Sequence, residues 1–126
     1  MKQKIQTVLA PEAIGPYSQA IKVDNVVYFS GQIPLDPKTM ELVADDFTQQ
    51  VIQTLQNLQE VAKAAGGELN KVVKLTVYLL DLKDFPVFNQ IMTQFFTEPY
   101  PARSTIQVSG LPKAAQIEVE AIMVIE

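Results

Sequence analysis

The sequence predicts an α+β domain of two layers, in which two α-helices cover one face of a mixed β-sheet of five or six strands. The chain has 126 residues, and neither a repeat nor a composition shift divides it, so residues 1–126 are expected to form one domain. A hydrophobic fraction of 48% and a charged fraction of 19% are ordinary for a globular protein. The segments follow the order strands, helix, strand, helix, strands. A crossover through a helix makes its two strands parallel, whereas a hairpin makes its strands antiparallel, so the sheet should be mixed.

The N-terminal part contains a hairpin between turns. Gly15-Pro16 indicates a turn that leads into an extended segment. Residues 20–23 and 26–30 are rich in β-branched and aromatic residues and flank Asp24-Asn25, a typical two-residue hairpin turn. The stretch SGQIPLDPKTMEL that follows contains two prolines, which exclude it from a central strand or a helix interior. We expect a surface loop there.

Two helices are predicted on either side of a strand. Apolar residues from Phe47 to Ala65 recur every three or four positions, with Asp45 or Asp46 as the N-cap and Gly66-Gly67 as the stop. The β-branched run at 71–82 predicts a strand, after which Asp84 is expected to cap a second helix. That helix should bury five apolar residues and end before two prolines: Phe88, Ile91, Met92, Phe95 and Phe96, then Pro99 and Pro101.

The last two strands, at 102–108 and 116–125, flank a turn at 110–113. The strands at 71–80 and 103–108 should be parallel neighbours. The strand at 72–80 is apolar on both faces, with Val73, Leu75, Val77 and Leu79 on one side and Val72, Tyr78 and Leu80 on the other. Two helices cover only one face, and a large exposed apolar face usually marks an association surface. The sequence therefore predicts a homo-oligomer with sheets facing inward, and a dimer fits this pattern as well as a trimer.

Composition excludes several classes of chemistry. The absence of cysteine and histidine excludes thiolate nucleophiles, Ser-His-Asp catalysis and most transition-metal sites, so no metal site is expected. A net charge of −4 makes nucleic acid an unfavourable partner. The N-terminus has only a broken apolar stretch, so neither a signal peptide nor a membrane anchor is expected, and the default location is the cytoplasm.

Arg103 is the only arginine in a chain with nine lysines. A surface arginine paired with a stray acidic side chain is the more common case. A chain that otherwise uses lysine, however, suggests that this position needs the planar guanidinium fork, which donates two parallel hydrogen bonds to a carboxylate.

Glu118 and Glu120 share one face of the last strand. The pair could equally be a solvated end of the sheet. If an oligomer buries that face, a desolvated carboxylate either pairs with a cation or has its proton affinity raised enough to act as an acid or base. Arg103 is the obvious cation. Tyr17 and Ser30 lie beside glycines where a ligand could approach, although such residues are more often turn or core residues.

Five segments together resemble the RidA family, also called YjgF/YER057c/UK114, over essentially the whole chain: AIGPYSQA, VVYFSGQIPLDP, AKAAGGELNKVVKLTVYLLDLKDF, FNQIMTQFFTEPYPARST and LPKAAQIEVEAI. The resemblance implies a chorismate-mutase-like subunit with a mixed six-stranded sheet, in a homotrimer with the sheets forming an inner barrel and a cleft at each subunit interface. It also implies an enamine/imine deaminase that hydrolyses 2-aminoacrylate, 2-iminobutyrate and related 2-imino acids to 2-keto acids and ammonia without a cofactor.

The resemblance also assigns site residues by position. It implies that Arg103 binds the substrate carboxylate, that Glu118 handles water and proton transfer, and that Thr105 acts through its backbone where many members have cysteine. The remaining implied site residues are Tyr17, Ser30, Gly31 and Asn89. The alternative is a regulatory trimer that binds a 2-keto acid or amino acid without turnover. Members of the family are also credited with ribonuclease, translation-inhibiting or chaperone-like activity, and the acidic pI of about 4.8 argues against the ribonuclease reading.

Overall fold

The computed structural model describes residues 1–126, and all six strands join one sheet in the order β1-β2-β3-β6-β4-β5. The β4–β5 pair is parallel and every other pair is antiparallel. This confirms the mixed six-stranded α+β prediction, including the parallel neighbours. The strands are β1 Lys2–Ile5, β2 Ala20–Val23, β3 Val26–Gln32, β4 Val72–Leu79, β5 Ala102–Gln107 and β6 Ile117–Val124; the helices are α1 Phe47–Ala64 and α2 Phe85–Phe95.

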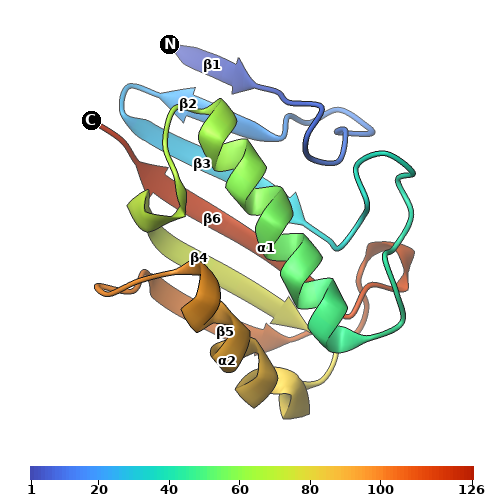
Figure 1. The fold of residues 1–126 in the computed structure, drawn as a ribbon. Helices are drawn as coiled ribbons and strands as arrows, with labels where there is room; N and C mark the ends of the chain where they lie inside the picture. The colour runs from blue at the N-terminus through green and yellow to red at the C-terminus, as the bar shows by residue number, and fades with distance from the viewer.

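Both helices lie on the same face of the sheet (Figure 1). Helix α1 contacts β3, β6 and α2, while α2 lies at the end of the sheet formed by β4 and β5. The core between the layers is one cluster of 25 buried residues, among them Leu55, Leu75, Val77 and Val119, all fully buried. None of the helices is long and apolar enough to cross a membrane.

The opposite face of the sheet is open in the single chain. Tyr28, Ile106 and Val124 are exposed there, and Glu118, Glu120 and Ile122 are only partly buried. The apolar character of this open face supports the predicted association of sheets, which stays a prediction for the single chain described here.

The predicted alternation of β4 is wrong at its first residues. Val72 pairs with Met123 and Lys74 pairs with Ile122, so an irregularity in the register lies between them. Consequently Val72 is 5% exposed and belongs to the core, whereas Val73 is 46% exposed. A β-bulge adds one residue to one strand and reverses the facing of the residues before it, which a strict period of two cannot anticipate.

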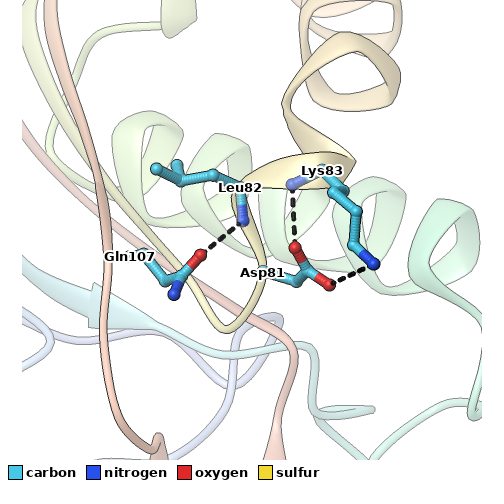
Figure 2. Close-up of polar contacts among 4 residues, drawn as sticks. All are labelled: Asp81, Leu82, Lys83 and Gln107. Atoms are coloured by element: carbon cyan, nitrogen blue, oxygen red, sulfur yellow. Dashed lines mark hydrogen bonds and ion pairs between the residues drawn. The ribbon is translucent and has the colours of Figure 1, made fainter.

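The helix caps agree with the predictions at α1 and differ at α2. Asp46 caps α1 by accepting a hydrogen bond from the Thr48 N–H at 3.3 Å. Asp84 precedes α2 but makes no capping hydrogen bond with its side chain. Instead Asp81 accepts from the Lys83 N–H at 2.9 Å, at the start of a short 3₁₀ turn that runs into α2. Figure 2 shows this turn, in which the Gln107 side chain also accepts from the Leu82 N–H at 3.0 Å.

Candidate functional site

Arg103 lies at the edge of the sheet and is held from helix α2. It occupies the second position of β5 and pairs with Leu75, whose side chain is fully buried under the helices. Its Nη1 donates to Asn89 Oδ1 at 2.7 Å and contacts Met92 Sδ at 3.4 Å. The guanidinium also lies over the Phe85 ring at 5.1 Å and the Phe88 ring at 5.6 Å. We call these four α2 residues the Arg103 cradle.

Next to the guanidinium is a cavity of about 410 Å³, lined by Asn89, Met92, Thr93, Tyr100, Pro101 and Arg103. Within the chain Arg103 donates only through Nη1, so its Nε–H and Nη2 donors have no protein partner. Partial burial lowers the pKa of Arg103 from its ordinary value, because desolvation disfavours the charged form. The arrangement can bind an anion through a guanidinium edge that the protein leaves free.

Glu118 lies in a second cavity, of about 530 Å³, that also contains three other predicted site residues: Tyr17, Ser30 and Gly31. Gly31 faces the Glu118 carboxylate so closely that a Cβ at position 31 would lie 2.8 Å from the carboxyl carbon. The Ser30 hydroxyl donates to the Ser18 carbonyl, which fixes it at the end of β3. The rim of this cavity also carries Glu12 and Lys113.

Burial raises the pKa of Glu118 above its ordinary value, and the negative charge of Glu120 raises it further. Glu120 in turn accepts a hydrogen bond from the Tyr78 hydroxyl at 2.9 Å. Burial first, and then the bond to Glu120, raises the pKa of Tyr78. A carboxyl group with a raised pKa is suited to take and return a proton near neutral pH.

Arg103 and Glu118 do not form an ion pair in the single chain. The only salt bridges within the chain are Glu60–Lys63 and Asp81–Lys83. The pairing of Arg103 with a carboxylate of β6 is expected only in an oligomer, so it stays a prediction. In the single chain Glu118 has a raised pKa and no cation partner.

The site residues therefore fall into two groups. Glu118 is the register partner of Tyr78 on the open face, whereas Arg103 pairs with Leu75 on the helix-covered face, and β4 lies between their strands. Two strand spacings of about 4.8 Å, and three residues of about 3.3 Å along β4, put their backbones roughly 14 Å apart, and their side chains lie on opposite faces of the sheet. Asn89 lies with Arg103, and Tyr17, Ser30 and Gly31 lie with Glu118.

Thr105 lies two residues after Arg103 on β5 and lines neither of the two cavities. Its hydroxyl is buried without a hydrogen-bond partner in the chain. Since β5 is an edge strand, one side of its backbone has no neighbouring strand and is available to a ligand or a second chain.

Sequence reasoning missed Phe85, Phe88 and Met92 as contacts of Arg103, and Tyr78 as the partner of Glu120. Positions 85, 88, 89 and 92 follow the spacing i, i+3, i+4, i+7 of one helix face. Together with a parallel neighbour strand, this spacing contains the signal for the cradle, but from the sequence Phe88 and Met92 are assigned only to the core and Phe85 is assigned no role.

Fold and cavities together define an α+β protein that separates a guanidinium with a free edge from a carboxyl group of raised pKa. Residues 7–125 match the protein family described as Endoribonuclease L-PSP, and the chain belongs to this family, the RidA family.

Relatives of the chain match it over nearly its full length. A RutC family protein of Pyrococcus horikoshii is 50% identical over 97% of each chain. Two relatives named 2-iminobutanoate/2-iminopropanoate deaminase are 45% identical: the Dermatophagoides farinae protein covers 99% of this chain and 98% of its own, and the human protein covers 98% and 90%.

Solved structures agree in fold. RidA of the Antarctic bacterium Psychrobacter has a TM-score of 0.95 at 50% identity, covering 98% of this chain and 99% of its own. TdcF of E. coli, solved with bound serine, has a TM-score of 0.92 at 40% identity, with the same coverage.

Proposed function

We propose that this chain is an enamine/imine deaminase that hydrolyses 2-aminoacrylate, 2-iminobutyrate and related 2-imino acids to 2-keto acids and ammonia. The observation that carries the proposal is the lone arginine, whose unpartnered Nε and Nη2 donors adjoin a cavity large enough for a small carboxylic acid. Full-length relatives named for this reaction support it.

Arg103 binds the substrate carboxylate in a bidentate contact and so orients C2. An enamine substrate first takes up a proton on carbon and loses one from nitrogen, which gives the imine. Water then adds its oxygen to C2, while Glu118 accepts the water proton and returns it to the nitrogen. The resulting carbinolamine transfers its hydroxyl proton to the amine, the C–N bond breaks, and ammonia and the 2-keto acid remain. Every atom of water appears in the products, and no electrons are transferred.

The reaction requires two copies of the chain, because one copy places Arg103 and Glu118 on opposite faces of its sheet. We propose a homotrimer in which the sheets form an inner barrel and each cleft takes Arg103, with Asn89 and the backbone of Thr105, from one subunit. The neighbouring subunit supplies Glu118, Tyr17, Ser30 and Gly31, which share a cavity. Tyr17 and Ser30 position the water or the departing amine, while Gly31 lets the substrate approach the backbone.

The proposal is tested by coupling threonine dehydratase to the purified protein and measuring 2-ketobutyrate release. Loss of a charge-assisted hydrogen bond costs about 1.5–3 kcal/mol, so Arg103→Ala should reduce kcat/KM about tenfold to a hundredfold. Arg103→Lys should recover only part of this, because lysine lacks the fork. Parental rates in an Arg103→Ala protein that stays folded would refute the role of Arg103, and no acceleration by the wild type would refute the deaminase itself.

The second candidate is a trimer that binds a 2-keto acid or amino acid without turnover, which the serine bound to the E. coli relative favours. Glu118→Ala separates the two. An enzyme loses turnover, typically by a hundredfold or more for a general acid–base group (~10²–10⁴), while its binding of 2-ketobutyrate stays measurable. A binding protein has no turnover to lose.

A further inference from the structure

We propose that Phe85 and Asn89 are positioning residues, which hold the Arg103 guanidinium so that its Nε–Nη2 edge stays free for a carboxylate. This inference rests on the proposed function of Arg103 and adds the residues through which α2 acts on it.

The contacts hold the guanidinium from different directions. Asn89 Oδ1 accepts from Nη1 at 2.7 Å, which fixes one end of the planar group. The faces of Phe85 and Phe88 lie 5.1 and 5.6 Å from the guanidinium carbon, within the ~6 Å reach of a cation–π contact. A planar cation fixed by two rings and one amide oxygen has little freedom to rotate. The Nε–H and Nη2 donors of Arg103 therefore keep a fixed orientation.

Holding Arg103 matters because an unrestrained arginine loses much rotamer freedom when it binds a ligand. A side chain that is already ordered binds with less of this loss. The cradle also supplies no carboxylate: Asn89 is a neutral acceptor, and neither salt bridge of the chain involves Arg103. The positive charge thus remains available to the substrate.

Phe85 and Phe88 differ in what else they do. Phe88 is fully buried in the core, so its loss would leave a cavity and destabilise the fold. Phe85 is only partly buried and packs against the edge of the core cluster. Phe95, on the same helix, is also partly buried against that cluster but makes no cation–π contact with Arg103. Phe85→Leu is therefore the informative change, and Phe95→Leu is its matched control.

The single arginine gives this inference a direct readout. In a ¹⁵N–¹H correlation spectrum the chain has one arginine Nε–H signal, which belongs to Arg103 without further assignment. A guanidinium held over two ring faces should give an upfield-shifted Nε–H that exchanges slowly with water. Phe85→Leu should move the signal downfield and speed its exchange, while Phe85→Tyr and Phe95→Leu should leave it near the wild-type position.

Three results would overturn the positioning role of Phe85. They are an Nε–H signal that does not move in Phe85→Leu, an equal change of the signal in Phe95→Leu, and a wild-type signal that exchanges too fast to observe. Asn89→Ala should also move the signal, because Nη1 loses its acceptor. An unmoved signal in Asn89→Ala would overturn the role of Asn89.

Turnover of 2-iminobutyrate supplies the second readout. Since cation–π contacts of a partly desolvated arginine are modest, Phe85→Leu should raise KM about threefold to tenfold with kcat nearly unchanged, and Phe85→Tyr should restore the parental KM. A parental KM in Phe85→Leu would overturn the inference. If the wild type shows no turnover, the proposed function fails, yet the Nε–H spectra still decide whether Phe85 and Asn89 position Arg103.

Discussion

At the scale of single residues, the proton affinity of Glu118 follows first from its burial and then from the charge of Glu120, both of which raise its pKa. Tyr78 holds Glu120 in place by a hydrogen bond. As the proposed base, Glu118 must be ionised, so activity should fall as the pH drops through its raised pKa.

Glu120→Gln tests this electrostatic coupling. The substitution removes the like charge and lowers the pKa of Glu118, so the acidic limb of the kcat/KM profile should move to lower pH. The profile is measured with 2-iminobutyrate between acidic and neutral pH. Glu12→Gln, which changes an exposed carboxylate on the rim of the same cavity, should leave the limb in place. An acidic limb that stays put in Glu120→Gln would mean that a different group controls it.

Gly31 is required by the close approach of Glu118. In Gly31→Ala the new Cβ would lie 2.8 Å from the carboxyl carbon and 2.9 Å from Cγ of Glu118, so that side chain must move. Because effective catalysis needs positioning within a fraction of an ångström, we expect kcat to fall about a hundredfold. Thermal unfolding should change little, because a partly exposed side chain can shift into the cavity. A large drop in Tm with unchanged kcat per folded molecule would contradict this account.

At the scale of elements, the turn between β4 and α2 depends on Asp81. Asp81→Ala removes the acceptor for the Lys83 N–H, and loss of such a cap costs about 1 kcal/mol. The decrease is measured as the free energy of unfolding in urea. Lys83→Ala removes only an exposed ion pair of 3.7 Å and should change stability by a few tenths of a kcal/mol at most. Equal losses in both variants would assign the effect to the ion pair.

Elements with a strong local signal could be predicted from the sequence. The apolar stripe of α1 and the hairpin at Asp24-Asn25 have patterns that neighbouring residues determine, and the parallel pair β4–β5 follows from the helix crossover that joins its strands. Strand β1 was not predicted, because KQKI buries only Ile5 and shows no alternation. The strand exists through its pairing with β2, a contact between distant residues that no local pattern encodes.

Buried polar residues on α1 likewise could not be predicted from a local sequence pattern. Asn57 is 1% exposed and donates to the carbonyl oxygens of Ile33 and Leu35, which ties the proline-containing loop to the helix. An apolar stripe cannot reveal such a residue, because its partners lie more than twenty positions away in the sequence.

The sequence indicates which residues belong to the candidate site, but not on which face of the sheet each one lies. The rarity of arginine indicated Arg103, and the spacing of Glu118 and Glu120 indicated one face of a strand. That Arg103 faces the helices while Glu118 faces the open side depends on the register of β4 with both neighbours, which only the structure provides.

At the scale of the whole molecule, separation of the two groups leads to a complementation experiment. Arg103→Ala and Glu118→Gln should each retain about a tenth of the wild-type rate or less when alone. If each cleft takes Arg103 from one subunit and Glu118 from the next, random mixing of equal amounts leaves about one quarter of the clefts intact. Unfolding and refolding the two variants together should therefore restore about a quarter of the wild-type rate, measured as 2-ketobutyrate release. A mixture as inactive as its parts would place both residues of each cleft in one chain.

The overall charge bears on the family description as an endoribonuclease. With a net charge of −4 and a single arginine, the chain has little of the positive surface that phosphate backbones require. Each of the two cavities has one cationic side chain, Arg103 with its free edge in one and Lys113 near Glu118 in the other. This distribution of charge suits a small monoanion.

The free edge of Arg103 also allows the protein to be modified chemically at a single arginine. Dicarbonyl reagents that modify guanidinium groups have a single target in this chain, and no cysteine competes for them. The pKa of Arg103 is lowered by burial, which increases the fraction of the neutral, reactive form. The number of subunits that gain one mass increment would thus equal the number of accessible clefts. A bound carboxylate would protect Arg103 from the reagent. Covalent labelling followed by mass spectrometry therefore measures the occupancy of the clefts without consuming any substrate.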